Sequence, residues 1–425
     1  MNILVISYET WCDTTNGGNV LSNIFADFKD DNFAQIYCSS GLPQNRLCSR
    51  YYQISDKMLM TRSGRSFETD GTAQQESVPA QDALFTKTKN SPLHEFFRLG
   101  REIMWKVFPW KTKELSKFIT GFKPDVIFAP CYYYAHTSWL AQYAYKLTGC
   151  PIISYISDDN YSMRKISFSP SFWINKLITR KAIRNLFSKC SLIYTMTDAQ
   201  KREYEEIFCK PMKILCKSAS FEDVQSNPPH KPIRLLYGGG LYLKRWKILL
   251  EIKKALEKIN SGEKKAYLDI FTAQNPPQKY VNALNDGKNS FIRPAVSYER
   301  LMQEYHASDI AVHVESFDRK NFLLTRLSFS TKIIDCLRSG CAVFAIGPRG
   351  QAGIDYLEDN DAAVCVRDKE DIFTALCGLI DNTQMISDYS RRAIELGRRN
   401  HSASEIAAGI KKDFEQIIKG QNANL

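Results

Sequence analysis

Residues 236–250 read LYGGGLYLKRWKILL, which is the end of an apolar strand, a run of three glycines and the basic start of a helix. We predict the strand at residues 233–237, the helix at 248–259 and the next strand at 267–271. A strand, a short turn and a crossover helix that leads into another strand are typical of an open parallel sheet. This part of the chain therefore predicts an α/β domain.

The same alternation of strands and helices continues on both sides of this run. After it, strands are expected at residues 290–292 and 310–314, and before it at 2–8, 33–38, 125–129, 151–156 and 191–195. The segment SNPPHKP at 226–232 has the composition of a linker. We predict Rossmann-like domains at 1–225 and 233–403, with an amphipathic helix at 404–425 that packs back across both halves. Such domains bind ligands at the carboxyl ends of their strands.

Composition limits the class of protein. The chain has 425 residues, is 44% hydrophobic and contains no run near the roughly 20 apolar residues that span a bilayer. Residues 1–8 have the pattern of a buried strand and lack the features of a leader, so we expect a cytoplasmic protein. The twelve cysteines are scattered without a CxxC pair, which favours reduced cysteines and argues against a zinc site. The net charge of +11 indicates an anionic partner, and because no nucleic-acid-binding signature is present we do not expect nucleic acid.

A second informative segment is SFSTKIIDCLRSG at residues 328–340. It places Ser330, Thr331 and Lys332 at the expected start of a helix and Asp335 one turn further along. Backbone N–H groups at a helix start, hydroxyl groups and an ammonium group suit a diphosphate. A carboxylate nearby could accept hydrogen bonds from ribose hydroxyls. The segment therefore predicts a site for a nucleotide-linked substrate, although a Ser or Thr here is also explained by helix capping.

Together, these two segments resemble retaining GT-B glycosyltransferases of the group-one (family four) type. The resemblance is strong over about residues 235–366 and only architectural in the first half. It implies a GT-B fold, in which two Rossmann-like domains with parallel sheets face a central cleft. It also implies transfer of a sugar from a nucleotide-diphospho-sugar with retention of configuration, without a metal ion or other cofactor.

The resemblance assigns roles to particular residues in the second half. In the family, a glycine-rich turn and basic side chains hold the donor diphosphate; the matching residues here are Gly239, Gly240 and Arg245, with Ser330, Thr331 and Lys332 facing the phosphates. Asp335 stands where the second Glu of a paired-glutamate motif binds ribose. The first Glu would fall near Leu327, so we expect Glu315, the nearest carboxylate, to lie beside the donor sugar, with a surface or capping role as the alternative.

The first half offers weaker candidates. Gly17 and Gly18, in an expected loop at residues 13–19, match the loop that brings backbone amides to the donor phosphate and acceptor in the family; a plain tight turn explains them equally well. Asp158 and Asp159 follow a predicted strand where the family often has a His that contacts the transferred sugar. We expect Asp158 to bind sugar hydroxyls or to position the acceptor, and capping of the next helix is the alternative.

The region at residues 94–119 mixes aromatic and basic side chains in one expected helical segment. This composition is typical of a helix at an anionic membrane surface, and an ordinary amphipathic helix with aromatic residues in the core is the alternative. The first interpretation predicts a lipid-linked glycan as acceptor, as in surface-polysaccharide assembly, and peripheral attachment to the inner face of the membrane. Two other functions stay open: a GT-B nucleotide-sugar epimerase, and a catalytically degenerate GT-B protein that only binds nucleotides or partners.

Overall fold

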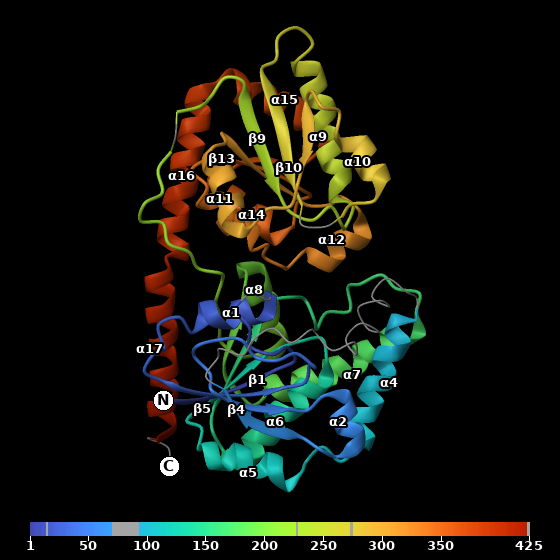
Figure 1. Cartoon of the computed structure of the whole chain (residues 1–425), viewed down its shortest axis with the longest axis vertical. Helices are drawn as coiled ribbons and strands as arrows, with labels where there is room; N and C mark the ends of the chain where they lie inside the picture. The colour runs from blue at the N-terminus through green and yellow to red at the C-terminus, as the bar shows by residue number, and fades with distance from the viewer. Residues whose placement is uncertain (14–15, 70–92, 227, 273–274, 423–425) are drawn as a thin grey trace. The chain divides into compact units, whose positions relative to one another are not determined.

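The computed structural model describes residues 1–13, 16–69, 93–226, 228–272 and 275–422, and the chain divides into two compact units (Figure 1). Unit 1 comprises Met1–Leu215 together with Ser404–Leu425, and unit 2 comprises Cys216–Ala403. Each unit is built on its own β-sheet with helices around it. Among the described helices, none is long and apolar enough to cross a membrane.

Within the described residues, the sheet of unit 1 has eight strands in the order β4-β3-β2-β1-β5-β6-β7-β8. Neighbouring strands are parallel, except that β4 runs antiparallel to β3 at the edge. In the middle of the sheet, Ile3 of β1 pairs with Phe33 of β2 and with Val126 of β5. The strands are β1 (Asn2–Ser7), β2 (Asn32–Tyr37), β3 (Arg50–Gln53), β4 (Arg65–Glu68), β5 (Val126–Pro130), β6 (Ile152–Ile156), β7 (Cys190–Thr195) and β8 (Met212–Ile214).

The helices of unit 1 begin at recognisable capping residues. Thr112 Oγ1 accepts a hydrogen bond from the backbone N–H of Leu115, and Thr197 caps α8 in the same way. Ser169 caps α7, whose first residue is Pro170. The helices are α1 (Asn16–Ile24), α2 (Asp56–Thr61), α4 (His94–Val107), α5 (Lys113–Phe122), α6 (Ala135–Thr148), α7 (Pro170–Phe187), α8 (Asp198–Phe208) and α17 (Ala403–Asn422).

The helix α17 packs in unit 1 although it lies at the other end of the sequence. The Phe414 ring is fully buried, with its centroid 5.9 Å from that of Phe25 and 5.6 Å from that of Phe28. Asp413 accepts a hydrogen bond of 2.8 Å from Tyr194 Oη and pairs with Lys213. Residues 404–422 therefore complete the core of this unit.

In the described part of unit 2, the sheet has six parallel strands in the order β11-β10-β9-β12-β13-β14. They are β9 (Ile233–Gly238), β10 (Ala266–Phe271), β11 (Ser290–Arg293), β12 (Ile310–Val314), β13 (Ala342–Ile346) and β14 (Val364–Val366). The helices are α9 (Arg245–Ile259), α10 (Gln278–Leu284), α11 (Tyr298–His306), α12 (Arg319–Thr325), α13 (Lys332–Leu337), α14 (Ala352–Asp359), α15 (Ile372–Asp381) and α16 (Thr383–His401), with a short 3₁₀ helix at Lys369–Asp371.

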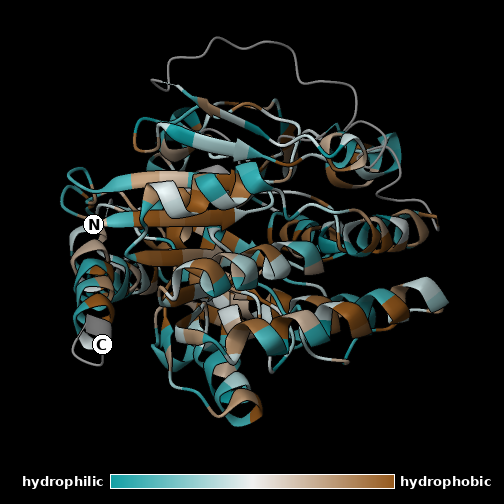
Figure 2. Ribbon diagram, turned by 90° about the horizontal axis from the view of Figure 1, so that it is seen from below, coloured by the Kyte–Doolittle hydropathy of each residue, from teal (hydrophilic) through white to brown (hydrophobic). Residues whose placement is uncertain are grey.

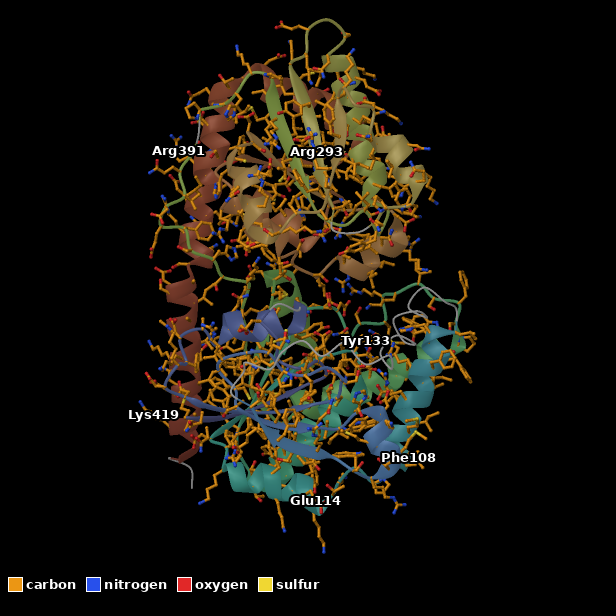
Figure 3. The ribbon with its side chains drawn as sticks, in the orientation of Figure 1. Phe108, Glu114, Tyr133, Arg293, Arg391 and Lys419 are labelled. Atoms are coloured by element: carbon orange, nitrogen blue, oxygen red, sulfur yellow. The ribbon has the colours of Figure 1, made fainter. Side chains whose placement is uncertain are left out.

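Two neighbouring strands of unit 2 are buried along their whole length. Every residue of β12 and β13 is buried, as expected for a parallel sheet covered on both faces. In unit 1, the strands visible in Figure 2 are coloured as largely hydrophobic and the helices beside them as mixed. At the end of β11, Arg293 reaches back to β10, where its Nε lies 2.6 Å from Asp269 Oδ1 (Figure 3).

Several predicted elements differ from those observed. Residues 94–119 form two helices, α4 and α5, because Pro109 lies in the connection between them and lacks a backbone N–H. Two elements, α2 and β4, lie in the polar segment at 56–69, where no helix or strand was predicted; residues 70–92 lie outside the described residues. The predicted loop around Gly17 and Gly18 is also wrong, because both glycines lie in the first turn of α1.

Candidate functional site

The glycine run at the end of β9 leads into an unusual backbone turn. Gly239 N–H donates to the carbonyl of Phe271, which keeps the turn in register with β10. Leu243 and Lys244 then both adopt left-handed backbone conformations, with φ of 56° and 61°. Such values are uncommon for residues other than glycine and are usually enforced by the surroundings. Helix α9 begins directly afterwards, at Arg245.

Contacts from the segment after β12 hold this turn in place. Asn321 Nδ2 donates a hydrogen bond of 3.0 Å to the carbonyl oxygen of Leu243. The ammonium group of Lys244 pairs with Asp318, which also caps α12. The two left-handed residues are therefore tied to a second element of unit 2, and the start of α9 has a defined position.

Arg245 and Glu315 form a bidentate ion pair. Arg245 Nη2 lies 2.7 Å from Glu315 Oε1, and Nε lies 3.3 Å from Oε2. The side chains are only 8% and 3% exposed. Burial works to lower the pKa of Arg245, but the charge and hydrogen bonds of Glu315, together with the nearby Tyr237 and Tyr242, outweigh it and the pKa is raised. The sequence predicted separate roles for the two residues, at the diphosphate and at the sugar, whereas the structure joins them.

Lys332, the first residue of α13, lies over the glycine turn. A Cβ atom added to Gly239 would lie 2.7 Å from Lys332 Nζ, so the absence of a side chain at 239 lets the ammonium group approach the backbone closely. Burial, followed by the nearby charge of Arg245, lowers the pKa of Lys332 to about 8. Among the described residues, no hydrogen bond or ion pair joins Lys332 Nζ to a partner; its nearest aromatic contact is the Tyr237 ring, 6.0 Å away. The ammonium group is suited to an anion from outside the chain.

His313 belongs to the same cluster and was missed by the sequence analysis. It lies two residues before Glu315, so both side chains point to one face, and its Nε2 is 3.8 Å from Glu315 Oε1. Burial, together with the charges of Arg245 and Lys332, lowers the pKa of His313 to about 3. The imidazole is therefore neutral at ordinary pH. A polar residue in the buried strand sequence IAVHV was the available signal.

Asp335 is held by two neighbours from other elements of unit 2. Its Oδ1 lies 2.9 Å from Lys217 Nζ and 2.8 Å from Tyr298 Oη. Burial and the charge of Asp335 raise the pKa of Tyr298, so this hydroxyl remains a donor. The carboxylate lies one turn after Lys332, as predicted, and ribose hydroxyls would have to compete with Tyr298 and Lys217 for it.

The hydroxyl-bearing residues predicted at the start of α13 have fewer side-chain contacts than Asp335. Thr331 is exposed and its side chain makes no capping hydrogen bond. Ser330 is half-buried, and its carbonyl accepts from the N–H of Ile333. The capping explanation for Thr331 is therefore wrong. Helix α13 has only six residues, so its dipole adds little beside the Lys332 ammonium group.

In unit 1, the two neighbouring carboxylates after β6 have different environments. Asp159 is buried and accepts hydrogen bonds from the Ser162 N–H at 2.9 Å and from Tyr204 Oη at 3.0 Å. Burial works to raise its pKa, but the hydrogen bonds from Ser162 prevail and the pKa is lowered. Asp159 thus stabilises the turn in which it lies. Asp158 is exposed, which leaves it accessible to an acceptor.

Within the described ranges, no group of three or more His, Cys, Asp or Glu side chains is placed to hold a metal ion. The cluster in unit 2 instead combines a buried ion pair, a neutral imidazole and an ammonium group beside a glycine turn. This set can bind an anion and hold it in a fixed orientation.

Comparison with known proteins identifies the fold. No family model matches the chain, and no curated protein matches it in sequence. Sucrose-phosphate synthase from Thermosynechococcus elongatus matches with a TM-score of 0.61 and 11% identity, covering 99% of both chains. Anabaena Alr3699/HepE in complex with UDP matches with a TM-score of 0.63 and 11% identity, covering 98% of this chain and 100% of that one. Trehalose 6-phosphate synthase from Burkholderia multivorans matches with a TM-score of 0.60 and 7% identity, over 100% and 98% of the chains.

At these identities the likeness concerns the fold alone. Two parallel-sheet α/β units, matched over nearly the whole chain by GT-B glycosyltransferases, show that this protein has the GT-B fold. The predicted fold class is confirmed.

Proposed function

We propose that the protein is a glycosyltransferase that moves a sugar from a nucleotide-diphospho-sugar to a glycan or lipid-linked acceptor. The proposal rests on Lys332, a partly buried ammonium group without an ion pair among the described residues, which lies close to the backbone of the glycine turn. A diphosphate has the charge and size for that place. Structures of the similarly folded Alr3699/HepE hold UDP and UDP-glucose, so a uridine-diphosphate sugar is the donor to test first.

The donor diphosphate is held by side chains of unit 2. Lys332 supplies one cation and the backbone at Gly239 and Gly240 allows close approach. Arg245 can add to this because its pair with Glu315 uses Nε and Nη2, and no hydrogen bond among the described residues engages Nη1. Asp335 accepts hydrogen bonds from the ribose hydroxyls once they displace Tyr298 Oη or Lys217 Nζ.

Transfer then depends mainly on positioning and electrostatics. As the bond between the anomeric carbon and the diphosphate oxygen breaks, negative charge builds on the leaving group and positive charge on the sugar ring. Fixed cations at Lys332 and Arg245 stabilise the leaving group, and Glu315 keeps the guanidinium oriented. We propose that the diphosphate oxygen takes the proton of the acceptor hydroxyl, that configuration is retained and that no metal ion takes part.

The acceptor side is assigned to unit 1. Asp158, exposed after β6, and the backbone at Gly17 and Gly18 in α1 are the candidates there. On the strength of the sequence resemblance and the net charge of +11, we propose a growing surface polysaccharide as acceptor and a cytoplasmic location at the membrane.

The test compares Lys332→Met with a matched control, Lys258→Met, in the full chain. Lys258 is exposed in the last turn of α9, which starts at the carboxyl end of β9 and runs away from it. Each protein is incubated with UDP-, GDP- and dTDP-sugars, and release of the free nucleoside diphosphate is measured. We expect slow donor hydrolysis by the wild type and by Lys258→Met, and a loss of at least about tenfold in Lys332→Met.

The products distinguish the rival functions. Interconversion of the sugar without nucleotide release would identify an epimerase, and binding without any turnover would identify a non-catalytic GT-B protein. Equal hydrolysis by Lys332→Met and the wild type would refute the role of Lys332.

A further inference from the structure

Helix α4 of unit 1 buries its charged residues. Arg98, Arg101 and Glu102 are 5%, 5% and 0% exposed. A helix on the surface of a globular protein usually turns its apolar face inward and its charged face to water. Here three charged side chains point inward together with Trp105, and their burial needs a cause.

The inward charges are all engaged in unit 1. The Glu102 carboxylate accepts hydrogen bonds from the N–H groups of Ala135 and His136, the first two residues of α6. Arg101 Nε lies 2.8 Å from Asp56 Oδ2, and its Nη1 donates to Tyr8 Oη at 2.8 Å. Turning the helix to bury its apolar face would break these contacts and leave charges buried without partners, so the orientation of α4 is fixed.

The outward face of α4 is correspondingly apolar. Phe96, Ile103 and Val107 are 62%, 49% and 71% exposed, and Gly100 between them has open space around it. Helix α7 packs beside α4, with Asn175 Nδ2 donating to the Glu95 carbonyl oxygen at 2.8 Å. It adds two more exposed side chains, and we call the resulting set the α4–α7 apolar stripe: Phe96, Ile103, Val107, Ile174 and Leu177. Exposed apolar patches of this kind mark interaction surfaces.

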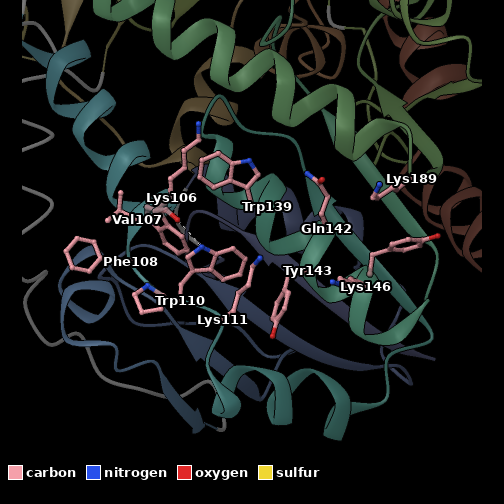
Figure 4. A pocket seen from close by; sticks show the side chains of 13 residues that line it. Lys106, Val107, Phe108, Trp110, Lys111, Trp139, Gln142, Tyr143, Lys146 and Lys189 are labelled. Carbon is pink, nitrogen blue, oxygen red and sulfur yellow. Dashed lines mark hydrogen bonds between the residues drawn. The ribbon is translucent and has the colours of Figure 1, made fainter.

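A basic hollow of about 710 Å³ adjoins the stripe at the C-terminal end of α4 (Figure 4). Val107 belongs both to the stripe and to the lining of the hollow. Four lysines line it and no Asp or Glu does among the described residues; the lysines are Lys106, Lys111, Lys146 and Lys189. In the described part of the chain, none of their ammonium groups forms an ion pair with a carboxylate.

Aromatic rings stand between these lysines. Lys106 Nζ lies 5.9 Å from the centroid of the Trp139 ring, and Lys111 Nζ lies 5.2 Å from that of Trp110 and 5.5 Å from that of Tyr143. Lysines with long apolar stems, beside Trp and Tyr, are the side chains that favour the boundary between lipid headgroups and acyl chains.

We propose that this face of unit 1 docks on an anionic lipid bilayer. The α4–α7 apolar stripe enters the headgroup boundary, and the basic hollow takes the phosphate of an anionic lipid headgroup. A membrane explains both halves of the surface, since apolar side chains and unpaired lysines meet at Val107; a soluble anion would explain only the lysines. The docking deepens the proposed location at the membrane and is independent of the donor chemistry, because it concerns residues of unit 1 alone.

The position of the basic hollow relative to the sheet of unit 1 is consistent with membrane docking. Lys146 lies in the last turn of α6 and Lys189 directly precedes β7, so the hollow faces the amino ends of the strands of unit 1. Asp158 follows β6 and therefore lies at the opposite, carboxyl edge. A bilayer held at the hollow leaves that edge accessible.

Vesicle co-sedimentation of the full chain tests the proposal. Vesicles of phosphatidylglycerol and phosphatidylcholine are compared with pure phosphatidylcholine. One double variant, Lys106→Glu with Lys146→Glu, removes positive charge at the hollow, and another, Phe96→Ser with Val107→Ser, removes apolar area from the stripe. The control is Lys29→Glu with Lys412→Glu, which makes the same charge change at exposed lysines elsewhere in unit 1.

We expect the wild type and the control to bind anionic vesicles within twofold of each other, and both test variants to bind at least about tenfold more weakly. Thermal unfolding of the Phe96→Ser/Val107→Ser protein should match the wild type, because the replaced side chains face solvent. A fall of its Tm by several degrees would mean that the chain itself covers the stripe, and would overturn the proposal. Absence of vesicle binding by the wild type, or full release of bound protein by millimolar inorganic phosphate, would overturn it as well.

Discussion

Replacing Lys332 by Met removes one charge while keeping the shape of an unbranched side chain. Two unit charges 4 Å apart interact by about 4 kcal/mol at the effective dielectric constant of a protein surface. Hydrogen bonds to charged groups contribute about 1.5–3 kcal/mol net after the loss of water contacts. Because Lys332 Nζ has no ion pair among the described residues to lose, that contribution should appear almost wholly in ligand affinity. We expect UDP to bind Lys332→Met about 10- to 150-fold more weakly.

The pH dependence sharpens this prediction. The pKa of Lys332 is lowered to about 8, and only its charged form binds the diphosphate well. In the wild type, the Kd for UDP should therefore rise by up to about tenfold per pH unit above 8, until the pKa of the complex is reached. The unliganded protein should behave in the opposite sense: between about pH 8 and 10.5 the unfolded chain holds more protons at this site, so stability rises with pH.

Isothermal titration calorimetry with UDP from pH 6.5 to 9.5 measures both effects, since it reports the Kd and the protons taken up. The Lys332→Met protein should show a weak and nearly flat profile over this range, with Lys258→Met as the matched control. An unchanged Kd in Lys332→Met, or the same rise in Kd above pH 8 in both proteins, would refute the assignment of the diphosphate to Lys332.

Other side chains give distinct expectations. Glu315→Gln leaves the buried Arg245 without its counter-charge and should lower the free energy of unfolding by about 3–5 kcal/mol, with part of the loss restored by saturating UDP; urea unfolding with and without UDP checks this, and an equal loss in both conditions would argue against a diphosphate near Arg245. Asp335→Ala should weaken the binding of UDP about 5- to 20-fold and leave the binding of inorganic diphosphate unchanged, as measured by calorimetry. If UDP and inorganic diphosphate lost affinity equally, Asp335 would not act through the ribose. Asp159→Ala should destabilise unit 1 by about 1–3 kcal/mol in thermal unfolding, whereas Asp158→Asn should keep the wild-type Tm and slow transfer; the reverse pattern would contradict the assigned roles.

The strands could largely be predicted from the sequence, because in both units they are buried apolar runs bounded by polar residues. The predicted strand at 310–314 coincides with β12, and that at 151–156 with β6 to within one residue. Helix α7 was missed although Ser169 and Pro170 form a regular helix start, since its apolar residues do not follow one face clearly. Its apolar side chains are divided between the core and the exposed stripe.

The candidate site was predictable in its residue types but not in its pairings. Arg245 and Glu315 are 70 residues apart, and only the positions of β9 and β12 in the sheet bring them together. The orientation of α4 was not predictable from its own residues, because it depends on Asp56, Tyr8 and the start of α6. Sequence patterns describe one element at a time, whereas these contacts depend on several.

The place of α17 affects the order in which the protein can fold. Unit 2 is continuous in sequence, while unit 1 needs residues 404–422 to cover the Phe25 and Phe28 rings. During synthesis, the ribosome therefore releases the first 215 residues long before the helix that completes their core exists. Unit 2 can fold earlier although it is made later. The emerging N-terminal part exposes apolar surface throughout that interval, and its yield in the cell should depend on chaperones.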